Sequence, residues 1–186
     1  VISDQQHFSM ETVSGDVILN MKVKGDEDNR LFFENMTFIS DRHKEADPFI
    51  KILKDSTLKE DQKKEAREAF QKINDKVVAH QEEIIARYPA TLTARMLKIS
   101  KQIDIPAPPK KADGSIDSTF QLRYYRKHFF DNFDLADDAL LHLPKPYYTE
   151  KLAEYLDKLF LQTPDSVMAA IDELALRVKK NPETYK

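Results

Sequence analysis

The sequence predicts a mainly α-helical fold, an irregular bundle of about six helices with an N-terminal β-hairpin remnant. Two observations carry this prediction. The 186 residues include only 3 Gly, and 33% of them are charged, a composition that suits helices because glycine weakens a helix interior. Apolar side chains also recur every three or four residues over several long segments, as on the buried face of an amphipathic helix.

Residues 1–24 predict the hairpin. Apolar and polar side chains alternate in HFSMETVSGDVILNMKV, residues 7–23, around the turn signal Ser14-Gly15-Asp16. Because two isolated strands are marginal in water, we expect them to be the end of a β-domain that lies upstream. The chain begins with Val-Ile-Ser and ends with NPETYK, which favours a fragment cut at both ends.

Residues 25–103 predict a first helical region. Acidic residues after Gly25 favour a helix start, and Pro48 is expected to kink or restart that helix. Ser56 is the candidate cap of the next helix, and a shorter helix is expected after Pro89. The apolar stripe of the middle helix consists of Ala66, Phe70, Ile73, Val77, Ile84 and Tyr88.

Residues 104–116 are expected to be a linker or surface loop, because DIPAPPKKADGS contains three prolines and a glycine. Residues 117–186 then predict a second helical region that packs with residues 25–103 as one bundle. Asp117 or Ser118 is expected to cap its first helix. Thr163 is expected to cap its last long helix, with Pro164 at the first position that favours proline.

The stretch RYYRKHFFDNFDLADD, residues 123–138, combines aromatic, basic and acidic side chains. A nucleic-acid surface needs a clustered positive field, whereas four aspartates occur here and the net charge is -3. A calcium loop needs alternating oxygen ligands, a turn glycine and a distal glutamate, and the stretch lacks that pattern. We therefore expect packing and helix capping, with Asp131 paired to Lys127 and Asp134 as an N-cap. This structural motif comprises Tyr124, Tyr125, His128, Phe129, Phe130, Asp131 and Asp134.

Catalytic chemistry is not predicted from the residues. His128 near aspartates could act as a general base, but one imidazole beside carboxylates is common on helices. His128 is therefore interpreted as a hydrogen-bonded core or boundary residue. His80 falls on an apolar stripe and is interpreted as a half-buried helix histidine. With no cysteine, the chain cannot carry out thiol chemistry or build a thiolate metal site. No catalytic, cofactor-binding or metal-binding residue is assigned, and no apolar run is long enough to span a membrane.

Two segments carry a family resemblance: YYRKHFFDNFDLADDALLHLP and YTEKLAEYLDKLFLQTPDSVMAAIDELALRVKKNPETYK. They resemble a helical domain of unknown function found N-terminal to thioredoxin-like domains in Bacteroidetes envelope proteins. Residues 8–36 look like the last strands of the small β-domain that precedes it and the helix that follows. The matching positions are Tyr125, His128-Phe129-Phe130-Asp131, Leu140-Leu141, Tyr155-Leu156 and Pro164-Asp165-Ser166.

The resemblance implies an exported protein of the periplasm or cell envelope. It also implies that redox chemistry belongs to a thioredoxin-like Cys-x-x-Cys domain beyond Lys186. The expected function is a non-catalytic accessory module that positions or dimerises this thiol-disulfide oxidoreductase or selects its partners. No cofactor and no nucleic-acid partner are expected; envelope proteins or a second copy are the candidate partners.

Two alternatives remain open. The first is a stand-alone helical adaptor that binds a peptide or envelope protein in an exposed apolar groove. The candidate binding surface is Tyr147, Tyr148 and Phe160. The second alternative is a metal-dependent hydrolase, in which two of His43, His80 and His128 would converge with carboxylates.

Overall fold

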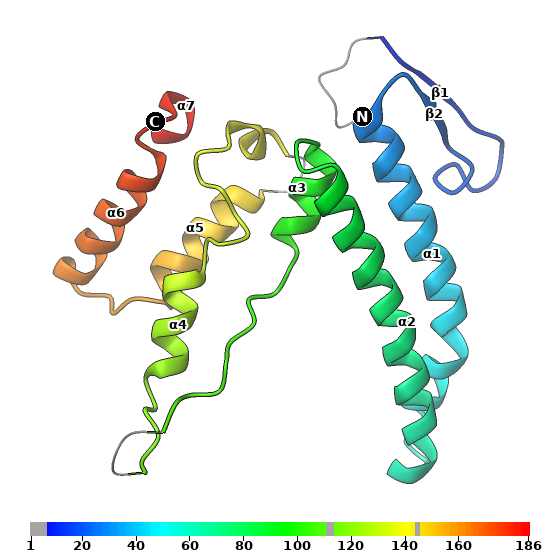
Figure 1. Cartoon of the computed structure of the whole chain (residues 1–186), viewed down its shortest axis with the longest axis horizontal. Coiled ribbons are helices and arrows are strands. Elements are labelled where there is room, and N and C mark those ends of the chain that lie inside the picture. The colour runs from blue at the N-terminus through cyan, green and yellow to red at the C-terminus, as the bar shows by residue number, and fades with distance from the viewer. Residues whose placement is uncertain (1–6, 111–113, 144–145) are drawn as a thin grey trace. The chain divides into compact units, whose positions relative to one another are not determined.

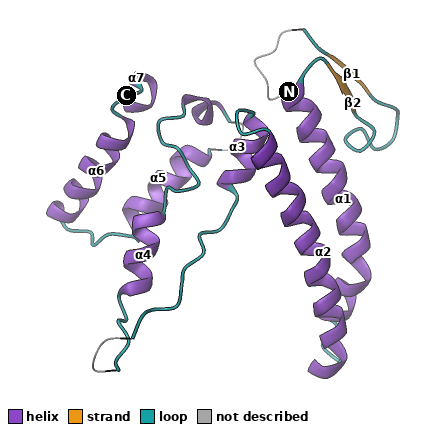
Figure 2. Ribbon diagram, viewed as in Figure 1, coloured by secondary structure: helices purple, strands orange, loops and turns teal. Residues whose placement is uncertain are grey.

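The predicted mainly α fold is confirmed in a computed structural model, which describes residues 7–110, 114–143 and 146–186. Within these ranges lie seven α-helices, one 3₁₀ helix and a two-stranded antiparallel sheet (Figures 1 and 2). The chain divides into two compact units, one ending at Leu97 and the other beginning at Lys98. Here they are called the N-terminal and C-terminal units. The packing of residues 25–103 with 117–186 as one bundle stays a prediction.

The predicted hairpin is present but short. Strand β1 (Ser9–Glu11) pairs with β2 (Lys22–Lys24), with Met10 opposite Val23. The ten residues between them form a loop held by Asp16, whose carbonyl accepts from the Asn20 backbone N–H at 3.1 Å. Gly25 turns the chain from β2 into the first helix with a φ of 86°, a left-handed conformation that favours glycine.

Helix α1 (Glu27–Lys54) begins where the acidic residues predicted a start. Asp26 is its N-cap, and the Asp26 carboxylate accepts from the Asn29 backbone N–H at 2.6 Å. Of the two outcomes expected at Pro48, the restart is wrong, because α1 continues through it to Lys54. Pro48 lies on the exposed side of the helix, where water can bond the carbonyl that proline leaves without a donor.

Helix α2 (Glu60–Arg87) packs beside α1, and the two run antiparallel (Figure 1). The predicted cap Ser56 is wrong. Lys59 is the N-cap, and its backbone N–H donates to the Gln62 side chain at 2.8 Å. The residues around Ser56 instead form a turn, in which the Asp55 carboxylate accepts from the backbone N–H and hydroxyl of Thr57. The buried apolar residues of the pair are Leu31, Ala46, Ala66, Ile73 and Ile84.

Helix α3 (Leu92–Ile99) is fastened to the start of α1. The Thr93 backbone N–H donates to the Asp28 carboxylate, and the Thr93 hydroxyl donates to the Asp28 carbonyl, both at 2.9 Å. Thr93 is almost fully buried, so these two bonds satisfy polar groups that would otherwise destabilise the fold. The boundary between the two units falls inside α3.

After the last residues of α3, residues 101–109 of the C-terminal unit are in neither helix nor strand. Helix α4 (Phe120–His128), the 3₁₀ helix η1 (Asp138–His142) and α5 (Tyr147–Lys158) follow. Helices α6 (Pro164–Val178) and α7 (Pro182–Tyr185) end the unit. Thr163 is the N-cap of α6 and Pro164 is its first residue, as predicted. Among the described residues, no helix is both long and apolar enough to cross a lipid bilayer.

The core of the C-terminal unit is an aromatic cluster around Tyr155, which is 0% exposed. The Tyr155 ring lies 4.6 Å from Phe130, 5.4 Å from Phe129 and 5.0 Å from Phe160, measured between centroids. The Tyr155 hydroxyl donates to the Glu173 carboxylate at 3.0 Å. Burial, followed by this bond, raises the pKa of Tyr155 to about 12. Helix α5 thereby joins the segment after α4 to α6.

Replacing Tyr155 by alanine should destabilise the C-terminal unit by about 3–5 kcal/mol, because it empties a large volume at the centre of the cluster. Tyr185→Ala is the matched control. Tyr185 is 59% exposed, so its loss should change stability by no more than about 0.5 kcal/mol. Urea unfolding followed by circular dichroism measures both. Similar losses for the two variants would contradict the central position of Tyr155.

Candidate functional site

The structural motif forms a packed boundary of the C-terminal unit. His128 Nδ1 lies 2.7 Å from Asp131 Oδ2, and the His128 ring stacks on Tyr124 with centroids 4.2 Å apart. The expected pairing of Asp131 with Lys127 is therefore replaced by a pairing with His128. The interpretation of His128 as a hydrogen-bonded boundary residue agrees with this geometry. Its imidazole is engaged on one nitrogen and one ring face, as in a structural side chain.

The aromatic residues of the motif divide between helix α4 and the segment after it. Tyr124 and Tyr125 lie in α4, which ends at His128 and contains no buried residue. Phe129 and Phe130 follow it and are buried. Tyr125 meets the Phe129 ring edge-on at 5.4 Å. The ammonium of Lys151 lies 3.9 Å from the Phe129 ring centroid, a favourable cation–π contact, and burial lowers the pKa of Lys151.

The two aspartates after the aromatic residues shape turns, but Asp134 is not the predicted N-cap. Asp137 is the N-cap of η1, and its carboxylate accepts from the Ala139 backbone N–H at 3.2 Å. The Asp134 carboxylate accepts from the Ala136 backbone N–H at 2.9 Å. The helix here is a short 3₁₀ element that begins at Asp138, so the first free N–H groups lie next to Asp137.

The predicted binding surface does not form one site. Tyr148 lies in the first turn of α5, where its hydroxyl donates to the Leu135 carbonyl at 2.7 Å. Phe160 follows the other end of α5, beneath the guanidinium of Arg126 at 4.3 Å. Tyr147 is half-buried at the start of the same helix. Phe160 lies twelve residues after Tyr148, and the ten of these residues that belong to α5 span about 15 Å along its axis.

Tyr148 does line an apolar groove. The groove has a volume of about 540 Å³ and is bordered by η1, α5, α6 and α7. Its lining is chiefly apolar, and the charged side chains of Glu183 and Lys186 lie at its α7 end. A hollow of this composition accepts an apolar side chain more readily than a charged one. Among its lining residues are Leu141, Tyr148, Leu152, Leu174, Val178 and Tyr185.

The histidines considered for metal chemistry occupy separate places. His80 on α2 stacks on Phe38 of α1 with ring centroids 4.0 Å apart. His43 on α1 is exposed, and its Nδ1 lies 3.9 Å from Asp47. Across residues 7–110, 114–143 and 146–186, no group of three or more His, Cys, Asp or Glu side chains is arranged to hold a metal ion.

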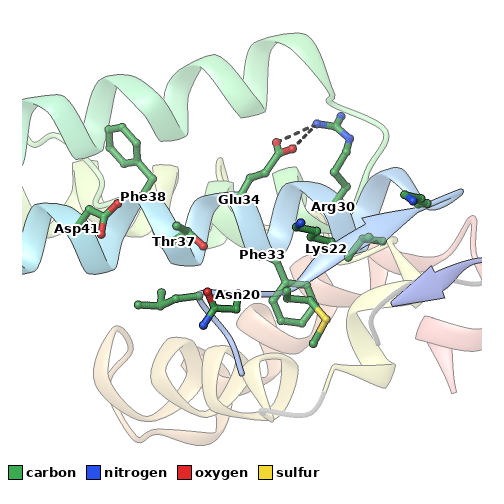
Figure 3. Close-up of a pocket in the computed structure, with 12 residues that line it drawn as sticks. Asn20, Lys22, Arg30, Phe33, Glu34, Thr37, Phe38 and Asp41 are labelled. Carbon is green, nitrogen blue, oxygen red and sulfur yellow. Dashed lines mark hydrogen bonds and ion pairs between the residues drawn. The ribbon is translucent and has the colours of Figure 1, made fainter. Parts of the chain in front are cut away.

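A second hollow lies in the N-terminal unit and was missed in the sequence. Residues 19–24 cover part of α1 and leave a cleft of about 650 Å³. Figure 3 shows Phe33 and Asn20 on one side of α1, and Arg30 and Glu34 on the other side. The Arg30 guanidinium binds the Glu34 carboxylate at 2.9 and 3.0 Å. The sequence did contain one signal for this cleft. Phe33, Thr37 and Asp41 recur every four residues and so share one face of α1.

A comparison with protein families identifies the family to which this chain belongs. The family described as a domain of unknown function, DUF5106, matches residues 60–186. The chain belongs to the DUF5106 family. The matched region begins at the first residue of α2 and contains the structural motif, the Tyr155 cluster and the apolar groove. The hairpin and α1, with the cleft between them, precede the match. No curated protein and no solved structure matches the chain.

The stack of His80 on Phe38 should make stability depend on pH. Burial lowers the pKa of His80 below its ordinary 6.5, although Glu83 and Glu34 oppose the shift. The unfolded chain then binds the proton more tightly. The contribution of neutral His80 is therefore complete above about pH 6.5 and is lost as the pH falls through the folded-state pKa. His80→Phe keeps an aromatic ring at this position and cannot be protonated.

Relative to His80→Phe, the DUF5106 chain should lose stability as the pH falls from about 7 to 5. Thermal unfolding at several pH values measures the difference. His43→Phe is the control at an exposed position and should retain the profile of the unmodified chain. Parallel profiles for the unmodified chain and His80→Phe would contradict the role assigned to the half-buried imidazole.

Proposed function

We propose that this DUF5106 chain is a non-catalytic helical module of a cell-envelope thiol-disulfide oxidoreductase. In this proposal a thioredoxin-like domain with a Cys-x-x-Cys motif is covalently attached after Lys186. The helical module positions that domain, pairs it with another copy, or selects its partners. The protein acts in the periplasm or elsewhere in the cell envelope.

One observation supports the non-catalytic part of the proposal. The motif side chains that could take part in acid–base chemistry are used in packing. His128 is stacked on Tyr124 and bonded to Asp131. The Tyr155 hydroxyl is bonded to Glu173 in the aromatic core. Groups held this way stabilise a fold, whereas a catalytic acid or base must reach a substrate in a cleft.

The thioredoxin-like partner is supported by the resemblance of residues 124–144 and 148–186 to domains that precede thioredoxin-like domains. The composition is consistent with a helical module that takes no part in thiol chemistry. The chain has no cysteine, and a thiolate is the nucleophile in disulfide exchange. In such a protein, all thiol chemistry would come from the attached domain.

The coding sequence should continue for about 200 residues past Lys186, enough for one ordinary domain, and should encode Cys-x-x-Cys at a helix start. In that protein, removal of the helical module should lower kcat/KM for protein disulfides. Reactivity toward a small disulfide should be unchanged, because the thiols are intact. The small-disulfide assay also shows that the shortened protein is folded. A following sequence without Cys-x-x-Cys, or equal loss on both substrates, would overturn the proposal.

The apolar groove favours a second candidate function, a stand-alone adaptor for a peptide or envelope protein. Leu141 lines the groove, whereas Leu122 is a similarly exposed leucine on α4 that does not line it. An adaptor should lose its partner on Leu141→Asp and keep it on Leu122→Asp. Affinity capture of envelope proteins by the three chains tests this, and retention of the same partner by both variants would exclude the groove as the docking site.

A further inference from the structure

Helix α6 carries an apolar strip that the C-terminal unit leaves uncovered. Pro164, Met168, Ile171 and Ala175 follow one another at intervals of four, three and four residues. This spacing aligns them along one side of a helix, as at the contact positions of a coiled coil. Met168 is 59% exposed and Ile171 is 50% exposed. The strip lies beside the buried face of α6, which contains Ala170 and Val178.

The strip and the apolar groove meet on α6. Ile171 and Ala175 belong to the strip and also line the groove, and Val178 lines the groove one turn further on. The N-terminal half of this surface therefore presents a protruding, flexible methionine at position 168. The C-terminal half presents a hollow of about 540 Å³. Methionine adapts well to irregular apolar hollows, so the two halves complement each other.

The charged side chains beside the strip change sign along α6. Asp165, Asp172 and Lys179 recur every seven residues, so they line one flank of the strip. All three residues are exposed. The flank is acidic toward the start of α6 and basic at its end. If a second α6 runs antiparallel, its basic end lies against the acidic end of the first, and the two helix dipoles also oppose favourably.

We infer that α6 is a self-association surface, on which a second copy of this chain docks antiparallel about a two-fold axis. Met168 of each copy enters the groove of the other, and Asp165 of each copy faces Lys179 of the other. The axis passes near Asp172, which meets its own symmetry mate. That like-charge pair makes the association reversible and dependent on concentration. A parallel pair would set hollow against hollow and acidic end against acidic end.

A two-fold arrangement buries the same patch on both copies, so a single substitution affects the interface twice. The inference deepens the proposed pairing role and names the partner as a second copy. Its test uses this chain alone. A failure of self-association would leave the attached thioredoxin-like domain untouched, and a missing Cys-x-x-Cys domain would leave self-association untouched.

Sedimentation of the 186-residue chain at concentrations up to about 1 mM should show a reversible shift toward twice its mass of 21.6 kDa. Met168→Gln combined with Ile171→Gln should weaken the association about tenfold or more. Leu122→Gln is the matched control, because Leu122 is 48% exposed on α4 and belongs neither to the strip nor to its charged flank. A monomer at every concentration, or equal weakening by the control, would overturn the inference.

Charge exchange tests the antiparallel direction. Asp165→Lys and Lys179→Asp should each weaken the dimer about tenfold, because each places like charges together twice. The double variant should return to within about threefold of the unmodified chain. Thermal unfolding of each variant confirms that α6 is intact. A double variant that associates no better than the single variants would overturn the antiparallel pairing.

Discussion

The complete burial of Tyr155 is the constraint on which the C-terminal unit depends. Its ring contacts Phe129 and Phe130 from the segment after α4, and its hydroxyl reaches Glu173 on α6. An aromatic hydroxyl loses its hydration when buried, so it needs a partner inside the protein. Glu173 is also bonded to Arg177 at 2.8 Å, and Arg177 lies 5.4 Å from the Phe130 ring centroid. One buried side chain thus fixes α6 against α5 by packing and by polar contacts.

This arrangement explains how a stretch so rich in functional residue types is used in core packing and in turns. The aromatic residues that follow α4 supply the core, and the acidic residues bond backbone N–H groups or His128 nearby. The Asp131, Asp134 and Asp137 carboxylates each have a local structural partner. Asp131 and Asp134 also line a hollow of about 320 Å³ together with Lys98 and Arg177. The apolar groove and the apolar side of α6 are separate open surfaces of the unit.

Much of the fold could be predicted because periodicity and capping act locally. The Thr163–Pro164 start of α6 and the acidic start of α1 were confirmed for that reason. Pro48 was misjudged because the cost of a proline depends on whether the freed carbonyl meets water, which is set by the packing of α1. Asp131 was assigned to Lys127 by helix spacing, but α4 ends at His128 and the turn beyond it brings the imidazole closer. The groove could not be predicted, because it depends on how η1, α5, α6 and α7 pack against one another and not on the pattern of any one of them.

The position of α6 gives the proposed self-association a geometric consequence. In an antiparallel pair, the C-terminal ends of the two helices lie at opposite ends of the contact. The 15 residues of α6 separate these ends by about 22 Å. If a catalytic domain follows Lys186 in each copy, the two domains begin far enough apart to avoid each other. They remain joined through the same interface, so the pair presents two active sites to one partner, and the effective concentration of the second site is raised.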